Sequence, residues 1–396
     1  MSLDDLFTPQ ARTLTPPMYG PPTQPEGVPL ISVAYGLADP ALFPREELVD
    51  ATAQILAADA NAALNYGPDA PELLALVAQR LRREGVDARE DQCMLAYGSS
   101  QILGLLPQVL LAPGDSVIIE APTFLGAVAR FRMAGANIIG VPVDAHGMDI
   151  DALEARLNEL RRAGVRPKFI YTIPTFHNPA GVTLTLERRQ RLVALAAEHG
   201  VLVVEDDAYV DLRFRGEPLP PLAALDQAGW VLRVGTFSKI LAPGLRMGWA
   251  HGPKALIDRL LMFKVEGSSG PFLTRLVARF AADGRLDAHI AALSAHYAAK
   301  CDLMVAALRR AMPDAQFELP DGGFFIWLRL PEGITASALT PVARRHGVEF
   351  LAGTRCFADG SGDDYIRLAF SEEPAARIEQ AVQRLGAAVD ELRPPG

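Results

Sequence analysis

The stretch KFIYTIPTFHNPAGVTLTLERRQRLVALAAEHGVLVVED, residues 168–206, decides the fold class. It opens with an apolar strand candidate at 168–174, continues through a helix candidate at 186–200, and ends in a second strand candidate at 201–206. The last segment is apolar from Val201 to Val204, which is typical of a strand covered on both faces. This alternation of strand and helix patterns predicts βαβ units around a mostly parallel sheet, and hence an α/β fold.

The same alternation continues towards the N-terminus. Strand candidates lie at 116–120 and 137–143, and helix candidates follow Pro122 and span 151–164. From about residue 290 the pattern changes to a long helix candidate at 297–312 and strand candidates at 322–330 and 365–370. We therefore expect a large domain at 31–285 and a smaller α+β C-terminal domain at 286–396. The proline-rich segment 1–30 is expected to be an extended arm, because proline disfavours helices and central strands.

Composition excludes several classes of function. The 396 residues are 49% hydrophobic and 21% charged with a net charge of -9, which fits an ordinary globular protein and argues against a nucleic-acid partner. No apolar run is long enough to suggest a membrane span, and the first ten residues do not resemble a signal peptide. Cys93, Cys301 and Cys356 are too dispersed for a disulfide framework or a zinc site, so we expect no metal and a cytoplasmic location.

The segment GTFSKILAPGLRMGW, residues 235–249, carries the sharpest chemical signal. Lys239 lies between the hydroxyl residues Thr236 and Ser238 and the cation Arg246. Hydroxyls and a guanidinium are suitable donors for a phosphate monoester. A lysine beside a bound aldehyde can form an imine. By itself, however, the segment also fits a surface lysine on a loop.

A second chemical signal follows the strand candidate that ends at Asp206. Ligands of open α/β sheets bind at the carboxyl edge of the strands, and Asp206 is expected at that edge. An aspartate there could pair with the nitrogen of a pyridine ring and keep that nitrogen protonated. The alternative is a solvated loop with a few acids.

Three further segments gain meaning only in combination. In YGSSQ, residues 97–101, Ser99 and Ser100 open a helix candidate whose N-terminus suits a phosphate, although a plain serine N-cap fits equally. Asn178 is presented by the turn NPAG, which alone indicates only a loop. Arg367 lies in the apolar strand candidate YIRLAF, either as a clamp for a carboxylate or as an edge-strand arginine facing water.

Together these segments resemble the fold-type I pyridoxal-5'-phosphate (PLP) enzymes, specifically the class I/II aminotransferase family. The resemblance rests on the order NPAG, EDDAY, GTFSK, LAPGLRMGW and YIRLAF, and it runs from about residue 35 to the last helix candidate. The branch looks closest to the 2-aminoadipate-type aminotransferases and to the PLP domains of related transcription regulators. The resemblance implies PLP as cofactor, an L-amino acid and a 2-oxo acid as substrates, and the PLP-dependent transferase fold.

The resemblance also implies roles for individual residues. Lys239 resembles the Schiff-base lysine and catalytic base, and Asp206 resembles the partner of the pyridine nitrogen. Asn178 and Tyr209 resemble the pair that binds the phenolic oxygen of the cofactor. The residues that resemble the phosphate cup are Ser99, Ser100, Gln101, Thr236, Ser238 and Arg246.

Four more positions match the family pattern. Phe124 resembles the aromatic residue that stacks on the cofactor ring, and Arg367 resembles the clamp for the α-carboxylate. Gly36, and Asn178 in a second role, resemble substrate-binding positions. Tyr66 resembles the tyrosine that reaches the phosphate of a neighbouring subunit, which implies a homodimer with shared active sites.

The sequence leaves two alternatives to transamination. Departures from the family pattern, such as LAGTRCF at 351–357, where relatives commonly place a proline before the glycine, leave open another PLP reaction: elimination, cyclisation or carbon–carbon bond formation. A ligand-sensing module that regulates transcription is the second alternative. It is disfavoured because only about 30 residues precede the resemblance and they are proline-rich rather than helical.

Overall fold

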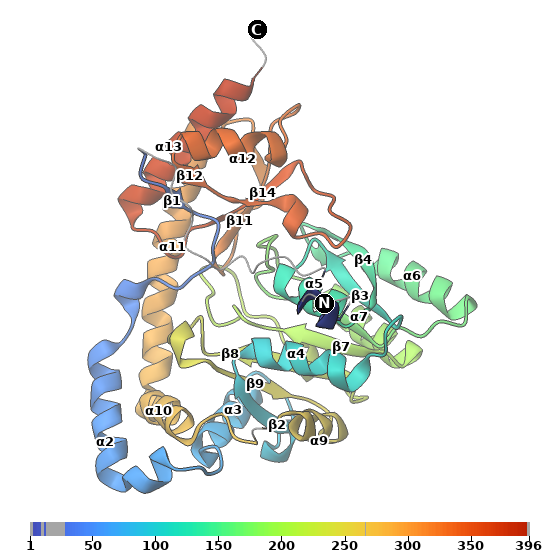
Figure 1. Cartoon of the computed structure of the whole chain (residues 1–396), viewed down its shortest axis with the longest axis vertical. Helices are drawn as coiled ribbons and strands as arrows, with labels where there is room; N and C mark the ends of the chain where they lie inside the picture. The colour runs from blue at the N-terminus through green and yellow to red at the C-terminus, as the bar shows by residue number, and fades with distance from the viewer. Residues whose placement is uncertain (1–2, 9–11, 13–27, 266, 394–396) are drawn as a thin grey trace.

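This computed structural model describes residues 3–8, 12, 28–265 and 267–393. An eight-stranded sheet forms the centre of the larger part of the fold (Figure 1). In spatial order its strands are β2 (Cys93–Tyr97), β9 (Met247–His251), β8 (Val231–Thr236), β7 (Leu202–Asp206), β6 (Phe169–Thr172), β3 (Ser116–Ala121), β4 (Asn137–Asp144) and β5 (Gly147–Met148). Neighbours from β8 to β4 pair in parallel, whereas β9 and β5 run antiparallel to their neighbours. The predicted mostly parallel α/β sheet is confirmed.

Helices cover both faces of this sheet because its central strands are apolar on both sides. Ile119 of β3 packs with α4 (Ser99–Leu110), α5 (Leu125–Met133) and α9 (Lys254–Phe263). Its neighbour Ile118 points the other way and packs with α6 (Ile150–Arg162) and α7 (Leu186–His199). The period of two along a strand places successive side chains on opposite faces, so a continuous apolar run fills two cores.

The C-terminal part has its own antiparallel sheet, as the sequence predicts. The strands are β10 (Gln316–Phe317), β11 (Phe325–Arg329), β14 (Tyr365–Ala369) and β13 (Leu351–Ala352), in that order. Its helices are α11 (Arg285–Ala311), α12 (Ala336–Arg345) and α13 (Ala375–Leu392). Figure 1 shows α11 running along both parts of the molecule. The predicted boundary between residues 285 and 286 therefore falls at the start of α11, which runs along both parts of the molecule.

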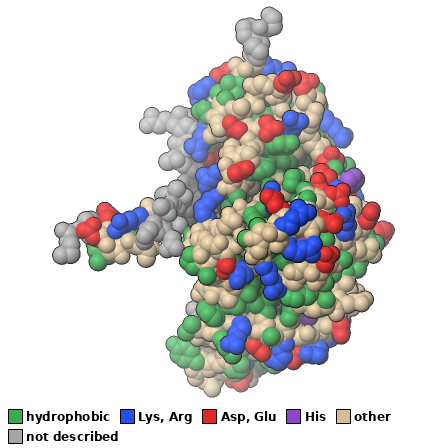
Figure 2. Space-filling model, turned by 90° about the vertical axis from the view of Figure 1, so that its right-hand side faces the viewer, with side chains coloured by type: hydrophobic (Ala, Val, Ile, Leu, Met, Phe, Trp, Pro, Cys, Tyr) green, Lys and Arg blue, Asp and Glu red, His purple; other side chains and the backbone are tan. Residues whose placement is uncertain are grey.

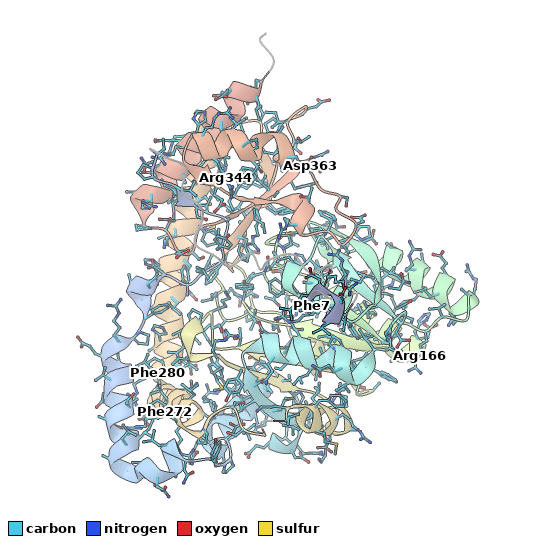
Figure 3. The ribbon with its side chains drawn as sticks, in the orientation of Figure 1. Phe7, Arg166, Phe272, Phe280, Arg344 and Asp363 are labelled. Atoms are coloured by element: carbon cyan, nitrogen blue, oxygen red, sulfur yellow. The ribbon has the colours of Figure 1, made fainter. Side chains whose placement is uncertain are left out.

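The N-terminal segment of the large part is also tied to the C-terminal part. The short strand β1 (Ile31–Ser32) pairs in parallel with β12 (Val348–Glu349). After it, α2 (Arg45–Leu64) and α3 (Pro71–Arg83) pack against α10 (Pro271–Ala281), whose Phe280 is buried in the largest core (Figure 3). Most of the predicted arm, residues 13–27 included, lies outside the described residues, and Leu3–Leu6 form a 3-10 helix.

Surface charge on the side of α6 is mixed. Figure 2 shows Lys and Arg side chains next to Asp and Glu side chains on this face. Ion pairs account for part of the pattern, including Arg188 with Asp144 and Arg191 with Asp151. Within the described residues, no helix is long and apolar enough to cross a membrane.

Candidate active site

A cavity of about 300 Å³ opens at the carboxyl edge of the large sheet. Strands β2, β3, β6, β7 and β8 all point to this edge, because β2 is antiparallel to β9 and β9 is antiparallel to β8. Residues that follow these strand ends therefore converge on one place. The predicted site residues that line the cavity are Gly36, Ser99, Ser100, Phe124, Asn178, Asp206, Tyr209, Thr236, Ser238, Lys239, Arg246 and Arg367.

A cup of hydrogen-bond donors forms one end of the cavity. The N-terminus of α4 supplies Ser99 and Ser100. The last residue of β8, Thr236, and Ser238 in the loop after it have hydroxyl oxygens 3.0 Å apart. Arg246 closes the cup and donates to the carbonyl oxygen of Tyr97 at 3.3 Å. Hydroxyls, a guanidinium and free helix N–H groups together suit a phosphate monoester.

Two glycines allow the parts of this cup to approach closely. Gly98 has a φ of 71°, and a Cβ there would lie 2.8 Å from a guanidinium nitrogen of Arg246. A Cβ on Gly248 would lie 2.5 Å from the backbone nitrogen of Ser99. Any side chain at Gly248 would therefore push the start of α4 away from β9. Arg246 itself has a φ of 50°, an uncommon conformation for a residue with a side chain.

Lys239 lines the same cavity. Its Nζ donates to the carbonyl oxygen of Gly36 at 2.8 Å and lies 5.7 Å from the centre of the Tyr209 ring. Burial, together with the nearby cations Arg367 and Arg246, lowers the pKa of this amine to about 8, against an opposing effect of Asp206. The amine is thus neutral in a larger fraction of molecules near neutral pH than an ordinary lysine amine, and in that form it can act as nucleophile or base.

Asp206 is the last residue of β7 and is buried, with 4% of its surface exposed. Its Oδ2 accepts a hydrogen bond from the hydroxyl of Tyr171 at 2.7 Å, and its Oδ1 has no hydrogen-bond partner among the described residues. Burial raises the pKa of Asp206 to about 6, while the hydrogen bond from Tyr171 opposes that rise. A buried acceptor without a partner, in a side chain that lines a cavity, is suited to a cationic ligand group.

Arg367 and Asn178 form a second polar pair in the cavity. Arg367 is buried and donates to Asn178 Oδ1 and to the carbonyl oxygen of Ala34, both at 2.7 Å. Its guanidinium also stacks over the Phe325 ring, 4.1 Å from the ring centre. Because Asn178 uses its oxygen to accept from Arg367, its amide nitrogen is the group left to donate to a ligand.

The loop that presents Asn178 is supported by Glu120, at the end of β3. Glu120 accepts from the Thr172 hydroxyl at 2.7 Å and from the backbone N–H of Ile173 at 2.8 Å. Its Oε2 also lies 3.0 Å from His177 Nε2. His177 Nδ1 accepts from the N–H of Ala180 at 3.1 Å, so Nε2 carries the proton that is donated to Glu120.

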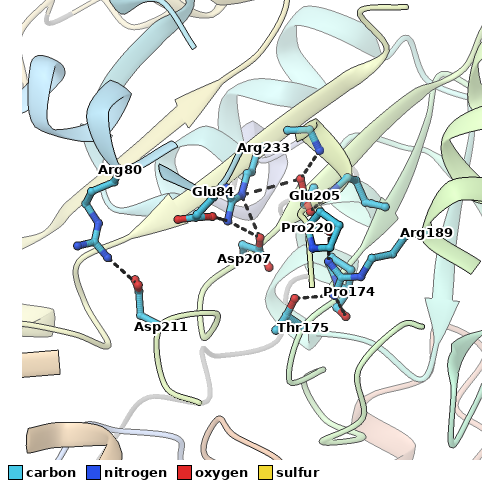
Figure 4. A network of polar contacts seen from close by, with 12 residues as sticks. Arg80, Glu84, Pro174, Thr175, Arg189, Glu205, Asp207, Asp211, Pro220 and Arg233 are labelled. Atoms are coloured by element: carbon cyan, nitrogen blue, oxygen red, sulfur yellow. Dashed lines mark hydrogen bonds and ion pairs between the residues drawn. The ribbon is translucent and has the colours of Figure 1, made fainter. Parts of the chain in front are cut away.

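A buried charge network lies on the other side of β7 (Figure 4). Arg233 of β8 is fully buried and pairs with Asp207 at 2.9 Å and with Glu84 at 2.5 Å. Arg189 of α7 donates to Pro174 O and Thr175 Oγ1, both at 2.8 Å, and so fixes the start of the Asn178 loop. The cations of this network offset the negative charge of the acids next to Asp206. Of the acids at this strand end, Asp206 is the one that lines the cavity.

Two of the predicted site residues do not line the cavity of this chain. The side chain of Gln101 turns back, and its Oε1 accepts from the backbone N–H of Tyr97 at 2.9 Å. Tyr66 is fully exposed and lies outside the lining. Within one chain, the structure therefore gives neither side chain a contact with the site.

Other residues of the site were not predicted from the sequence. Tyr35, Leu37, Leu125, Ile173 and Phe325 line the cavity without a motif that marks them. Tyr171 and Glu120 did carry a signal. Each is a polar residue inside or at the end of an apolar strand candidate, and a polar side chain that such a strand buries needs a hydrogen-bond partner.

The residues present fit PLP. The donor cup suits its phosphate, the buried Oδ1 of Asp206 suits a protonated ring nitrogen, and Lys239 can bind its aldehyde. Phe124 lines the cavity next to Ser99 and Ser100 and offers an apolar ring against which a flat cofactor could stack.

Comparison with known proteins agrees with this geometry. The family model described as "Aminotransferase class I and II" matches residues 36–385. Aromatic-amino-acid aminotransferase 1 of Thermococcus litoralis is 37% identical over 91% of this chain and 88% of its own. The crystal structure of a multiple substrate aminotransferase from Thermococcus profundus has a TM-score of 0.91 at 34% identity and covers 99% of both chains. The alpha-aminoadipate aminotransferase from Thermus thermophilus, solved with N-(5'-phosphopyridoxyl)-L-leucine, has a TM-score of 0.90 at 32% identity and covers 99% of both chains.

Proposed function

The chain belongs to the class I and II aminotransferase family, and on that basis we propose that Lys239, Asp206 and Arg367 carry its reaction. The protein is a PLP-dependent enzyme that transfers an amino group between an L-amino acid and a 2-oxo acid. One observation carries the assignment of residues. The cavity is lined by a lysine amine, a buried carboxylate and a buried guanidinium. The cup of donors that suits a phosphate lines the same cavity.

Lys239 binds the cofactor and moves the proton. When bound, PLP would supply an aldehyde that is reactive towards amines and a ring that withdraws electrons from the Cα of the amino acid. Lys239 would hold the cofactor through its Nζ, and the neutral Nζ would remove the Cα proton of the substrate. A lowered pKa, about 8, keeps a useful fraction of this amine neutral.

The other polar residues bind and orient. Asp206 would hold the protonated ring nitrogen at its Oδ1, and Asn178 and Tyr209, which line the same cavity, would hold the phenolic oxygen. Arg367 binds the α-carboxylate of the substrate with two parallel hydrogen bonds, as planar guanidinium groups do. The Cα–H bond is thereby placed next to Lys239.

The described lining of the cavity favours donors with apolar or aromatic side chains. Its cations are Lys239, Arg246 and Arg367, and each already has a role with the cofactor or the α-carboxylate. The remaining lining side chains include Tyr35, Leu37, Leu125, Ile173 and Phe325. An acidic side chain of a donor would be buried against these residues without a cation to pair with, and burial of an unpaired charge costs free energy. The relative named aromatic-amino-acid aminotransferase supports this choice.

A homodimer with shared sites is the assembly that we propose. Tyr66 is exposed to 104% in the single chain, and α2 before it exposes Val49 and Leu64 to 70% and 69%. Apolar exposure of this kind is typical of a surface that another chain covers. Sedimentation at micromolar concentration should give twice the monomer mass, and a monomer with full activity would contradict the proposal.

The cysteine pattern supports the cytoplasm as the proposed compartment.

The residue roles are tested by trapping the cofactor on the protein. Borohydride reduction of the PLP-loaded protein, followed by peptide mass spectrometry, should place the cofactor on the peptide that contains Lys239. Lys239→Ala should lose this adduct and the absorption band of the bound cofactor, while Lys254→Ala, which removes an exposed lysine of α9, should keep both. Phenylalanine and leucine should then convert the wild-type cofactor to its pyridoxamine form more efficiently than glutamate. A preference for glutamate would contradict the proposed donor class, and an adduct elsewhere would contradict the role of Lys239.

A further inference from the structure

The two carboxylate oxygens of Asp206 have different surroundings. Oδ2 accepts the hydroxyl proton of Tyr171 at 2.7 Å, and both residues are buried. Oδ1 is buried and has no partner among the described residues, and Asp206 lines the cavity. A carboxylate can rotate about its last bond and exchange its two oxygens. The bond from Tyr171 removes this freedom because it ties one oxygen to the protein.

Tyr171 is itself held firmly. It belongs to β6, where it pairs with Val204 of β7, and none of its surface is exposed. Its ring packs edge-on against Phe131 of α5 with ring centres 5.6 Å apart. The hydroxyl is thus delivered to the end of the neighbouring strand by a side chain with no room to move, and it does not itself line the cavity.

We propose that Tyr171 is a positioning residue that orients Asp206, with Oδ1 towards the cavity, and that stabilises its ionised form. This inference rests on the proposed role of Asp206 as partner of the cofactor's ring nitrogen. An ionised, correctly turned carboxylate keeps that nitrogen protonated, whereas a neutral or rotated one does not. Tyr171 therefore acts on the reaction through Asp206 and touches neither substrate nor cofactor.

Other charges also act on Asp206, and the test has to separate them from Tyr171. Glu120 on β3 and Asp207, directly after β7, disfavour its ionised form, whereas Arg130 on α5 favours it. Lys239, on the loop after β8, faces it across the cavity. All four remain in place in Tyr171→Phe, which deletes one hydroxyl and retains the ring that packs on Phe131.

The first measurement uses the cofactor-free protein. Carboxyl-labelled aspartate gives a carbon NMR signal for Asp206, assigned by its loss in Asp206→Asn. In Tyr171→Phe we expect the pKa of Asp206 to rise by about 1, because a hydrogen bond to the charged form is lost. Replacement of Tyr171 by 3-fluorotyrosine, a stronger donor, should lower it. Tyr297→Phe is the matched control: this tyrosine is equally buried, its hydroxyl accepts from the N–H of Asp39 at 3.1 Å, and it lies outside the cavity lining.

The second measurement is the dissociation constant of PLP. Tyr171→Phe should bind PLP about tenfold more weakly than wild type, and Tyr297→Phe should bind it as wild type does. If Asp206→Asn is weakened and Tyr171→Phe matches Tyr297→Phe in both measurements, the inference is wrong and the proposed function stands. If Asp206→Asn binds PLP like the wild type, the proposed role of Asp206 itself is wrong.

Discussion

The amine of Lys239 lies 2.8 Å from the carbonyl oxygen of Gly36, although 203 positions separate the two residues in the sequence. Gly36 can approach this closely because it has no side chain. A Cβ at this position would lie 2.3 Å from the Phe325 ring, which in turn supports Arg367. One backbone segment thus fixes the proposed catalytic lysine and, through Phe325, the proposed carboxylate clamp.

The reactivity of Lys239 should depend on pH. Because its pKa is about 8, the fraction of molecules with a neutral, nucleophilic amine rises about tenfold per pH unit below that value and reaches a plateau above it. The rate of PLP attachment to the cofactor-free protein, followed by stopped-flow absorbance from pH 6 to 9.5, should follow this curve. Arg367→Gln removes a cation that lowers the pKa of Lys239, so the midpoint should move to higher pH. A midpoint that stays in place would contradict the electrostatic cause.

Arg367→Gln should also weaken substrate binding. The loss of a buried two-bond clamp on a carboxylate is expected to raise the KM for the amino acid about 100-fold. Arg329→Gln on the neighbouring strand is the control, because Arg329 is exposed, pairs with Asp364 at 3.3 Å, lies over the Tyr365 ring and is not part of the cavity lining. An equal rise of KM in both variants would show that the effect is not specific to the clamp.

Gly248→Ala should weaken cofactor binding. Its Cβ would collide with the backbone of Gly98 and Ser99 at 2.5 Å and displace the N-terminus of α4 from the phosphate cup. We expect PLP affinity to fall at least about tenfold in equilibrium dialysis. Gly244→Ala is the matched control, since a Cβ at Gly244 meets nothing within 4 Å. Unchanged affinity in Gly248→Ala would mean that the close approach has no role in binding.

Glu120→Ala should destabilise the fold. It leaves the hydroxyl of Thr172, the N–H of Ile173 and the Nε2–H of His177 buried without their acceptor. The expected loss is about 3–5 kcal/mol in the free energy of unfolding, measured with urea. Glu159→Ala removes an exposed carboxylate paired with Arg156 and should change stability by less than about 0.5 kcal/mol. Similar values for the two variants would contradict the supporting role of Glu120.

Much of the fold and of the site could be predicted because the signals are local. The run VLVVED became β7, since four consecutive apolar residues need cover on both faces. The acid at its end was predicted at the carboxyl edge of the sheet, where ligands of open α/β sheets bind, and the family resemblance assigned Lys239 to the same cofactor. Both residues line one cavity. Gln101 shows the limit of such reasoning: it belongs to the motif YGSSQ, but its side-chain oxygen accepts a hydrogen bond from the N–H of Tyr97 and does not line the cavity.

The sequence by itself determined the α/β class, the order of the chemical segments and the identity of the groups that act, because these depend on residue type and spacing. Only the tertiary structure decided which groups meet. Residues from separate elements meet in three places: the hydrogen bond from Tyr171 to Asp206, the hydrogen bond from Lys239 to Gly36, and the cavity lining that includes Leu37 and Leu125. Such contacts depend on how strands and helices pack in three dimensions, and no periodicity along the chain records that packing.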